Sequence, residues 1–220
     1  MTMGTHILVS EIFHSIQGES SFAGWPCAFI RLAGCGHGCR HCDTAYAEEE
    51  GILMPIEEAV RQALSFGAPC VEVTGGEPLR QPGVYPLLKA LCDGSPHVLL
   101  ETGGFLPVDR VDPRVLSIID IKPPSSGVAE DNCIENIPIA QRTPGKFEFK
   151  FVLASRADYL WAKSFITVHG MAGTCTIIFG AVFGELDPRY LAEWILEDRL
   201  PVRMQLQLHK YIWKPDTRGV

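Results

Sequence analysis

The chain has 220 residues, of which 46% are hydrophobic and 20% are charged, so it can bury the core of one sizeable domain. Its formal net charge of -7 and the lack of any basic run argue against a nucleic-acid-binding surface, because phosphate groups are neutralised by clustered Lys and Arg. No segment approaches roughly 18 consecutive apolar residues, and the start Met-Thr-Met-Gly-Thr-His lacks the features of a secretory signal. We therefore expect a cytoplasmic protein with no membrane or nucleic-acid partner.

The first predicted strand covers residues 7–13 and leads into a polar turn that contains Gln17, Gly18 and Glu19. Side chains in such a turn can face a ligand, although a solvated surface turn has the same composition. Residues 27–32 then form a nearly continuous apolar run, which is typical of a buried parallel strand. Arg31 is the only charge in this run, and a charge in such a place is usually paired or functional.

A glycine-rich segment with three cysteines follows at once, and we call residues 33–46 the cysteine loop. Cys35, Cys39 and Cys42 have the spacing C-x3-C-x2-C, which allows three thiolates to converge on one point. A structural zinc site and a closed [4Fe-4S] cluster both need four ligands, so three cysteines indicate a cluster with one open iron. The alternative is zinc bound by the three cysteines and either His37 or His41.

The rest of the chain alternates between predicted helices and strands. Helices are predicted from Pro55 to about Gly67, over 84–92, over about 156–165 with Ser155 as N-cap, and over about 188–197; strands are predicted over 70–74, 98–101, 116–121, 147–153, 175–179 and 202–208. Residues 123–146, rich in Pro, Ser, Gly and Asn, are predicted to be a loop with the role of a lid, a dimer contact or a poorly ordered segment. Repeated strand-helix-strand units produce a parallel sheet, and right-handed crossovers curl it. We therefore predict one α/β domain over residues 1–220, folded as a partial, incomplete TIM-like barrel of about six β/α units with parallel strands.

Polar residues recur where the predicted strands end. The segments concerned are Thr74-Gly-Gly-Glu-Pro78, Glu101-Thr-Gly-Gly104, Asp120-Ile-Lys-Pro-Pro-Ser-Ser-Gly127, and 205–210. Parallel strands end at one rim, where barrels of this class build active sites. In residues 74–78, the glycine-rich loop, two glycines let the backbone approach a ligand, and Glu77 offers a carboxylate to an ammonium group.

The cysteine loop followed by the glycine-rich loop, in this order on an α/β frame, resembles the radical S-adenosylmethionine superfamily. The resemblance implies that Cys35, Cys39 and Cys42 hold a [4Fe-4S] cluster. The open iron would bind the amino and carboxylate groups of S-adenosylmethionine. The residues that the resemblance assigns to this cofactor are Gly75, Gly76, Glu77, Lys122 and Ser125.

Further motifs narrow the resemblance to one family. They are Gln17-Gly-Glu19, Cys42-Asp43-Thr44, Glu101-Thr102-Gly103, Asp120-Ile-Lys122 with Ser125-Ser-Gly127, and Gln207-Leu-His209-Lys210. From about residue 10 onward the chain resembles the 7-carboxy-7-deazaguanine synthase family. That implies a homodimeric carbon-nitrogen lyase, which converts 6-carboxy-5,6,7,8-tetrahydropterin to 7-carboxy-7-deazaguanine with loss of ammonia in queuosine biosynthesis. An external one-electron reductant of the flavodoxin or ferredoxin type would feed the cluster. The radical formed from S-adenosylmethionine would then take a hydrogen from the pterin and later return it.

The same resemblance assigns a magnesium ligand and the substrate contacts. Thr44 would bind Mg²⁺ together with substrate oxygens and water. Glutamates suit the N–H donors of the aminopyrimidine, and an arginine suits the carboxylate. The residues that would surround the pterin are Gln17, Glu19, Arg31, Glu101 and His209, the last of them in a C-terminal tail that we define as residues 205–220. Ser20 stands where relatives often carry glycine.

Two other functions share part of this pattern. A glycyl-radical-enzyme activase has the same cysteine spacing but acts on a partner protein, and Gln17-Gly-Glu19 with the terminal Gln-Leu-His-Lys motif favours a small-molecule substrate. A non-catalytic zinc or iron-sulfur module is the alternative from another class, and it leaves the glycine-rich loop without a role.

Overall fold

The fold is built around one open β-sheet. The structure is a computed structural model, and it describes residues 5–220, so residues 1–4 lie outside the description. The strand order is β3-β1-β2-β4-β5-β6-β7-β8-β9. The strands are β1 (His6–Ile16), β2 (Pro26–Leu32), β3 (Ile52–Pro55), β4 (Cys70–Gly75), β5 (Val98–Thr102), β6 (Leu116–Asp120), β7 (Phe147–Leu153), β8 (Thr176–Ala181) and β9 (Arg203–Met204). From β2 to β9 all neighbours are parallel, whereas β1 pairs antiparallel with β2 and β3. The partial α/β barrel expected from the sequence is confirmed, with two antiparallel strands added at one edge.

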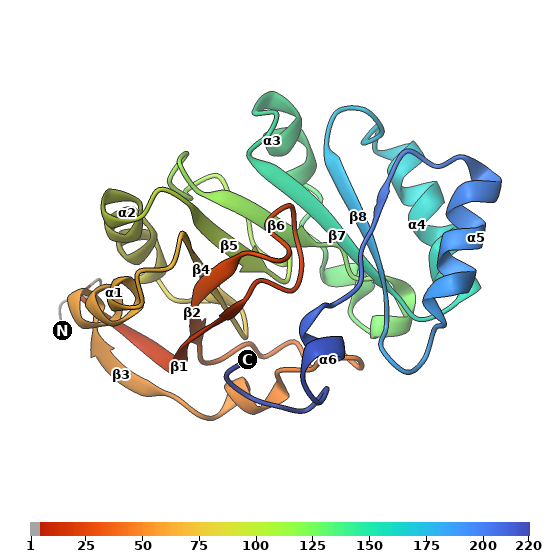
Figure 1. Cartoon of the computed structure of the whole chain (residues 1–220). Helices are drawn as coiled ribbons and strands as arrows, with labels where there is room; N and C mark the ends of the chain where they lie inside the picture. The colour runs from red at the N-terminus through yellow and green to blue at the C-terminus, as the bar shows by residue number, and fades with distance from the viewer. Residues whose placement is uncertain (1–4) are drawn as a thin grey trace.

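Helices cover the outside of this curved sheet (Figure 1). They are α1 (Ile56–Ser65), α2 (Val84–Gly94), α3 (Asn136–Arg142), α4 (Arg156–Val168), α5 (Pro188–Asp198) and α6 (His209–Ile212), with short 3-10 turns η1 (Ala45–Glu48), η2 (Pro78–Arg80), η3 (Pro124–Ser126) and η4 (Ala129–Asp131). In Figure 1, α1 and α2 lie toward one end of the sheet and α4 and α5 toward the other, while α6 lies near the chain that follows the cysteine loop. Within residues 5–220, no helix is long and apolar enough to cross a membrane.

The core lies between the sheet and the outer helices. Helices α1 to α5 turn apolar residues inward, as in α1, where Ile56, Ala59 and Ala63 are buried. The strands of the parallel part are buried on both faces, which explains their continuous apolar sequences. The inner face also carries buried charges, among them Glu72 on β4 and Lys150 on β7.

Two expectations about local structure were wrong. The last strand is limited to Arg203–Met204, because after Gln205 the chain leaves β8 and the N–H of Leu208 bonds to the carbonyl of Gly18. Residues 123–146 are not one loop, since α3 forms there where the buried Asn136 side chain binds the backbone of Leu106 and Val108. Strand β2 is buried and parallel to β4, as expected, and β1 pairs antiparallel with its other edge.

The β1–β2 loop (residues 17–25) contacts the C-terminal tail, which follows the edge strand β9. The side-chain amide of Gln205 donates to the carbonyl of Ser20 over 2.8 Å, and Leu208 N lies 3.1 Å from Gly18 O. A Cβ on residue 18 would overlap the ring of His209, so this close approach requires glycine. Ser20 has a φ of +65°, in the left-handed region that glycine adopts more readily than serine.

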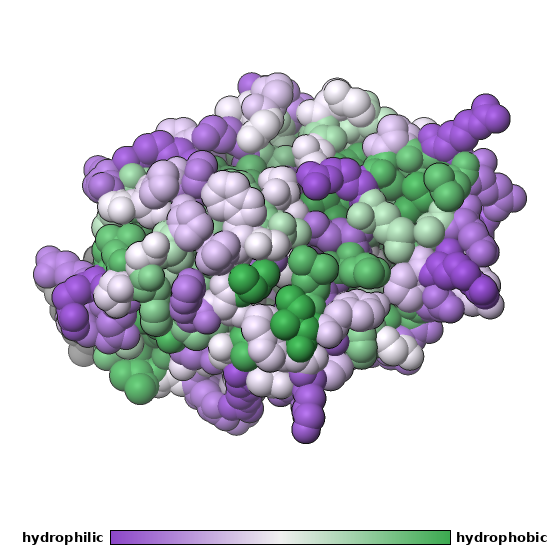
Figure 2. Space-filling view, viewed as in Figure 1, coloured by the Kyte–Doolittle hydropathy of each residue, from purple (hydrophilic) through white to green (hydrophobic). Residues whose placement is uncertain are grey.

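The two rims of the barrel differ in character. At the amino ends of the strands lies a cavity of about 380 Å³, whose lining includes Val98, Lys146 and Glu148. At the carboxyl ends lie the cysteine loop, the glycine-rich loop and the tail. On the face shown in Figure 2, apolar side chains gather around α6, where Leu206, Tyr211 and Ile212 are exposed.

Candidate active site

The cysteine loop leaves β2 at the carboxyl rim and is held from two sides. Gly34, Gly36 and Gly38 all have a positive φ, which lets the backbone coil tightly between the cysteines. The N–H groups of Cys35 and Gly36 donate to one oxygen of Glu48, at 2.8 and 2.9 Å. Further along, the N–H of Arg40 donates to the carbonyl of Ser126. The loop is therefore positioned by η1 and η3.

The three thiols of the loop are free and near solvent. Cys35 and Cys39 are partly buried and Cys42 is exposed. Burial raises the pKa of Cys35 and of Cys39, and in each case the charge of the next cysteine adds to the effect. Among residues 5–220, no three His, Cys, Asp or Glu side chains form a ready-made metal site. The donor set, three neighbouring thiols from one loop, fits a [4Fe-4S] cluster with an open iron.

The two histidines of the loop have partners outside it. The His37 ring stacks on Phe105, with centroids 3.6 Å apart, and faces Asp131. Nδ1 of His41 lies 3.0 Å from Glu185 on the β8–α5 connection. These contacts give both rings a role in holding the loop.

The glycine-rich loop packs directly against the cysteine loop. The N–H of Gly76 donates to the carbonyl of Leu32, and the N–H of Glu77 donates to the carbonyl of Gly34, each over 3.0 Å. A Cβ on Gly76 would collide with the backbone of Gly34. The two motifs, about 40 residues apart in the chain, thus form one surface at the rim.

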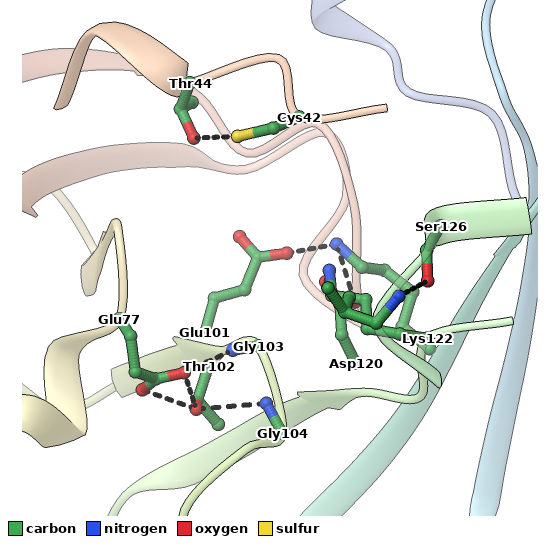
Figure 3. Close-up of polar contacts among 12 residues, drawn as sticks. Cys42, Thr44, Glu77, Glu101, Thr102, Gly103, Gly104, Asp120, Lys122 and Ser126 are labelled. Atoms are coloured by element: carbon green, nitrogen blue, oxygen red, sulfur yellow. Dashed lines mark hydrogen bonds and ion pairs between the residues drawn. The ribbon is translucent and has the colours of Figure 1, made fainter. Parts of the chain in front are cut away.

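The carboxylate of Glu77 is fully buried and binds protein groups (Figure 3). It accepts hydrogen bonds from Leu79 N at 3.0 Å, from Gly103 N at 2.9 Å and from the Thr102 hydroxyl at 2.7 Å. Burial raises the pKa of Glu77, and these three donors oppose the shift. We expected this carboxylate to face a ligand; instead it ties the glycine-rich loop to the end of β5.

The other predicted cofactor and metal residues occupy the same rim. The Thr44 hydroxyl makes no capping bond although the residue precedes η1, and it lies 3.8 Å from the sulfur of Cys42. Nζ of Lys122 pairs with Asp120 at 2.6 Å. The Ser125 hydroxyl donates to Asp158 at 2.6 Å, so it is committed to the fold.

The guanidinium group of Arg31 is fixed through its Nε, which leaves its two terminal nitrogens for a ligand. Its Nε donates to Glu11 at 2.7 Å, and the Tyr46 hydroxyl donates to the same oxygen at 2.6 Å. Burial would lower the pKa of Arg31, but Tyr46 and Glu11 outweigh it and raise this pKa. Within residues 5–220, the two terminal nitrogens have no hydrogen-bonded partner. They can therefore bind a carboxylate with two parallel bonds.

A buried ammonium group lies at the centre of the predicted substrate site. Nζ of Lys150 lies 2.6 Å from Glu19 and 3.4 Å from Asp120, and it also pairs closely with Glu101. The Lys150 side chain is only 7% exposed. Burial alone would lower the pKa of Lys150, but Asp120, Glu101 and Glu19 raise it well above its usual value. Three strands and the β1–β2 loop thus meet at one permanent positive charge.

A second buried contact fixes Gln17. Its Nε2 donates to Glu72 on β4, and its Oε1 accepts from the N–H of Glu19 over 3.1 Å. Burial, followed by the nearby charge of Glu101, raises the pKa of Glu72 well above its usual value. Gln17 is 4% exposed, so it shapes the turn that presents Glu19.

The tail brings the remaining predicted residue to the site. His209 lies against Gly18, and burial lowers the pKa of its ring, which is therefore neutral at pH 7. Lys210 pairs with Asp43 at 2.7 Å, which ties α6 to the cysteine loop. The predicted substrate contacts from both ends of the chain are thereby brought together.

Several residues of the site were not identified from the sequence. Glu72 is the lone charge of an apolar strand, and this signal, which singled out Arg31, would have found it. Lys150 shares its apolar strand with Glu148, so the same signal is weaker there. Glu48, Glu11 and Tyr46 act through hydrogen bonds across the fold, and no local pattern marks them.

Known proteins resemble the chain along nearly its whole length. A family model described as the radical SAM superfamily matches residues 29–119, which contain both loops. A protein of Chlorobaculum tepidum named 7-carboxy-7-deazaguanine synthase is 72% identical over 212 residues, covering 96% of each chain. A protein of the same name from Koribacter versatilis is 40% identical over 228 residues, covering 96% of this chain and 99% of its own.

Solved structures share the fold. QueE from Escherichia coli matches with a TM-score of 0.73 at 22% identity, over 91% of this chain and 94% of its own. Streptococcus suis SuiB bound to its precursor peptide SuiA matches with a TM-score of 0.61 at 15% identity, over 80% of this chain and 48% of its own. The open barrel is thus an architecture already seen in solved proteins.

Proposed function

Because the chain belongs to the 7-carboxy-7-deazaguanine synthase family of radical S-adenosylmethionine enzymes, we propose specific roles for its residues in converting 6-carboxy-5,6,7,8-tetrahydropterin to 7-carboxy-7-deazaguanine with loss of ammonia. The observation that carries the proposal is the adjacency at one rim of two cofactor loops and a chamber lined by Glu19, Glu101 and Arg31. Membership of this family favours a small-molecule substrate over the protein substrate of a glycyl-radical-enzyme activase. It also argues against the alternative function as a non-catalytic zinc module.

Cys35, Cys39 and Cys42 hold the cluster in this proposal. Together, the cluster and S-adenosylmethionine supply a carbon radical that removes hydrogen from the substrate. The backbone of Gly75 and Gly76 faces the amino end of S-adenosylmethionine, and Glu77 keeps that backbone in place through the bonds described above. Lys122 is a further contact for this cofactor, whereas Ser125 supports it through Asp158.

The substrate is held through its pyrimidine ring and its carboxylate. Glu19 and Glu101 accept hydrogen bonds from ring N–H groups, Arg31 binds the carboxylate, and neutral His209 closes the chamber. The inner face of the open sheet would limit the access of water to the bound substrate.

The assay that tests this function combines the anaerobically reconstituted enzyme with carboxytetrahydropterin, S-adenosylmethionine and a one-electron reductant. We expect 7-carboxy-7-deazaguanine as the product, detected by mass spectrometry. If S-adenosylmethionine is cleaved but no deazaguanine forms from this pterin, the substrate assignment is wrong.

Replacing Arg31 with lysine is expected to raise KM for the pterin roughly 100-fold, because an ammonium cannot hold Glu11 and two carboxylate oxygens at once. Cleavage of S-adenosylmethionine in the absence of pterin should persist. Steady-state kinetics of both reactions measures the two effects. Arg61→Lys, on the exposed face of α1 beside Glu58, is the matched control and should leave KM unchanged.

We propose that Thr44 binds Mg²⁺, which is supported by the position of its hydroxyl beside the cysteine loop, 3.8 Å from the sulfur of Cys42. Thr44→Val is expected to abolish the dependence of rate on magnesium and to lower kcat/KM roughly 10-fold, while Thr44→Ser retains both. The measurement is a magnesium titration at constant cluster content. A Thr44→Val enzyme with the wild-type magnesium response would show that the ion binds elsewhere.

We also propose that the protein acts as a homodimer, receives electrons from a flavodoxin or ferredoxin type of reductant, and works in the cytoplasm. Its residues 1–220 then serve as one functional domain, in keeping with the single sheet. Sedimentation of the reconstituted protein tests the dimer.

A further inference from the structure

The proposed substrate chamber contains four carboxylates, and Lys150 contacts three of them. Glu19, Glu72, Glu101 and Asp120 come from the β1–β2 loop and from strands β4, β5 and β6. Carboxylates this close repel one another unless a cation lies between them. Lys150, from β7, is the cation that contacts three of them.

Lys150 contacts only one oxygen of the Glu19 carboxylate and one of the Glu101 carboxylate, which leaves the other oxygen of each for a ligand. Lys150 binds Oε2 of Glu19 and Oε1 of Glu101. Among residues 5–220, Oε1 of Glu19 has no hydrogen-bond donor, and Oε2 of Glu101 has only the hydroxyl of Thr74 at 3.4 Å. One oxygen of each carboxylate is thus anchored and the other is available to accept a hydrogen bond.

Building on the proposed function, we propose that Lys150 is the positioning residue that orients Glu19 and Glu101 to accept hydrogen bonds from the aminopyrimidine of the pterin. Lys150 is not a proton donor in this scheme, because its three acidic partners hold its proton tightly. Its charge offsets the repulsion between the two carboxylates, and its position sets the distance between them.

Loss of the Lys150 ammonium group is expected to change the pKa of Glu101. Burial raises the pKa of Glu101, and Lys150 is the largest influence that opposes the rise. The titratable groups that face Lys150 are Glu19, Asp43, Glu72, Glu101, Asp120, Lys122 and His209. Removing the ammonium leaves Lys122 on the far side of Asp120 as the remaining permanent cation of this set, so the pKa of Glu101 rises further. A larger fraction of Glu101 is then protonated at a given pH, and the neutral group is a weaker hydrogen-bond acceptor than the carboxylate.

The test compares Lys150→Met, Lys150→Arg and Lys146→Met. Lys146 lies on the approach to the same strand and lines the cavity at the opposite rim, so it is a matched control for loss of a lysine. We expect Lys150→Met to raise KM for the pterin roughly 100-fold at pH 7, with cluster absorbance and pterin-free cleavage of S-adenosylmethionine unchanged. Its kcat/KM should recover as pH rises, since Glu101 regains its charge, whereas wild type stays flat over that range. Lys150→Arg should remain within roughly 10-fold of wild type because it keeps the charge.

A double-mutant cycle with Glu101→Gln separates positioning from simple structural support. If Lys150 acts through Glu101, then Lys150→Met adds less than roughly 10-fold to KM in the Glu101→Gln background. Should Lys150→Met give no folded protein, Lys150→Gln takes its place, since the amide keeps much of the volume without the charge. A loss that is equal at every pH and equal in Lys150→Arg, or an unchanged KM in the charge-removing variant, would overturn the proposal. A wild-type enzyme that makes no deazaguanine would contradict the proposed function instead, and equilibrium binding of the pterin would still report on Lys150.

Discussion

Cys39→Ser is expected to leave the protein folded but without a cluster and without detectable turnover. Cys39 is the middle of three thiols from one loop, and a serine hydroxyl does not replace a thiolate as an iron ligand. With only two sulfurs remaining, the loop cannot hold the irons that activate S-adenosylmethionine. Iron and sulfide analysis, the visible spectrum and product formation after anaerobic reconstitution measure the loss.

The matched control is Cys92→Ala, at a partly buried cysteine on α2 outside the cysteine loop. This variant should retain the full iron content and the wild-type rate. Full iron content in Cys39→Ser, or loss of iron in Cys92→Ala, would show that the cluster is bound by a different set of cysteines.

Glu77→Ala is expected to abolish binding of S-adenosylmethionine and to lower the free energy of unfolding by about 3 to 5 kcal/mol. The substitution leaves the N–H groups of Leu79 and Gly103 and the hydroxyl of Thr102 without their acceptor in a buried place. The glycine-rich loop then separates from the end of β5, and its backbone no longer faces the cofactor. Calorimetric titration with S-adenosylmethionine and denaturant unfolding measure the two effects.

Thr102→Val distinguishes positioning from direct contact. This variant keeps the shape of the side chain but removes one donor to Glu77, so it should weaken binding of S-adenosylmethionine by roughly 10-fold if Glu77 acts by holding the loops together. Unchanged binding in Thr102→Val, together with complete loss in Glu77→Ala, would indicate instead that the carboxylate touches the cofactor. Wild-type binding in Glu77→Ala would contradict both roles.

Much of the fold follows from local sequence. The helix with Ile56, Ala59 and Ala63 on one face, the strand over Phe147–Leu153 and the Ser155 cap were all predicted and are present. The errors lie where distant contacts decide the structure. Residues 205–208 have the composition of a strand, but Leu208 bonds to Gly18 and the chain leaves the sheet. The short helix α3 depends on the buried amide of Asn136, a tertiary contact without a local signal.

The candidate site divides in the same way. The three cysteines within eight residues can be recognised from their spacing, because an iron-sulfur cluster requires a fixed number and type of protein ligands. Glu77 was recognised by its motif, yet its partners on β5 were not visible, so its carboxylate was expected to face outward. Lys150 lies on β7, whereas Glu101 lies on β5 and Glu19 lies in the β1–β2 loop, so only the tertiary fold brings these two carboxylates within reach. Asp120 is the direct neighbour of Lys150 on β6.

The contact between the β1–β2 loop and the tail also affects when the substrate chamber can form during synthesis of the chain. The bond between Gln205 and Ser20 spans 185 residues of sequence. Residues 17–20 therefore leave the ribosome long before their partners exist, while the cysteine loop and the glycine-rich loop can already pack together. The chamber around Glu19 closes last, after Gln205 and Leu208 have emerged, so a chain that stops short of them carries both cofactor loops beside an unfinished substrate wall.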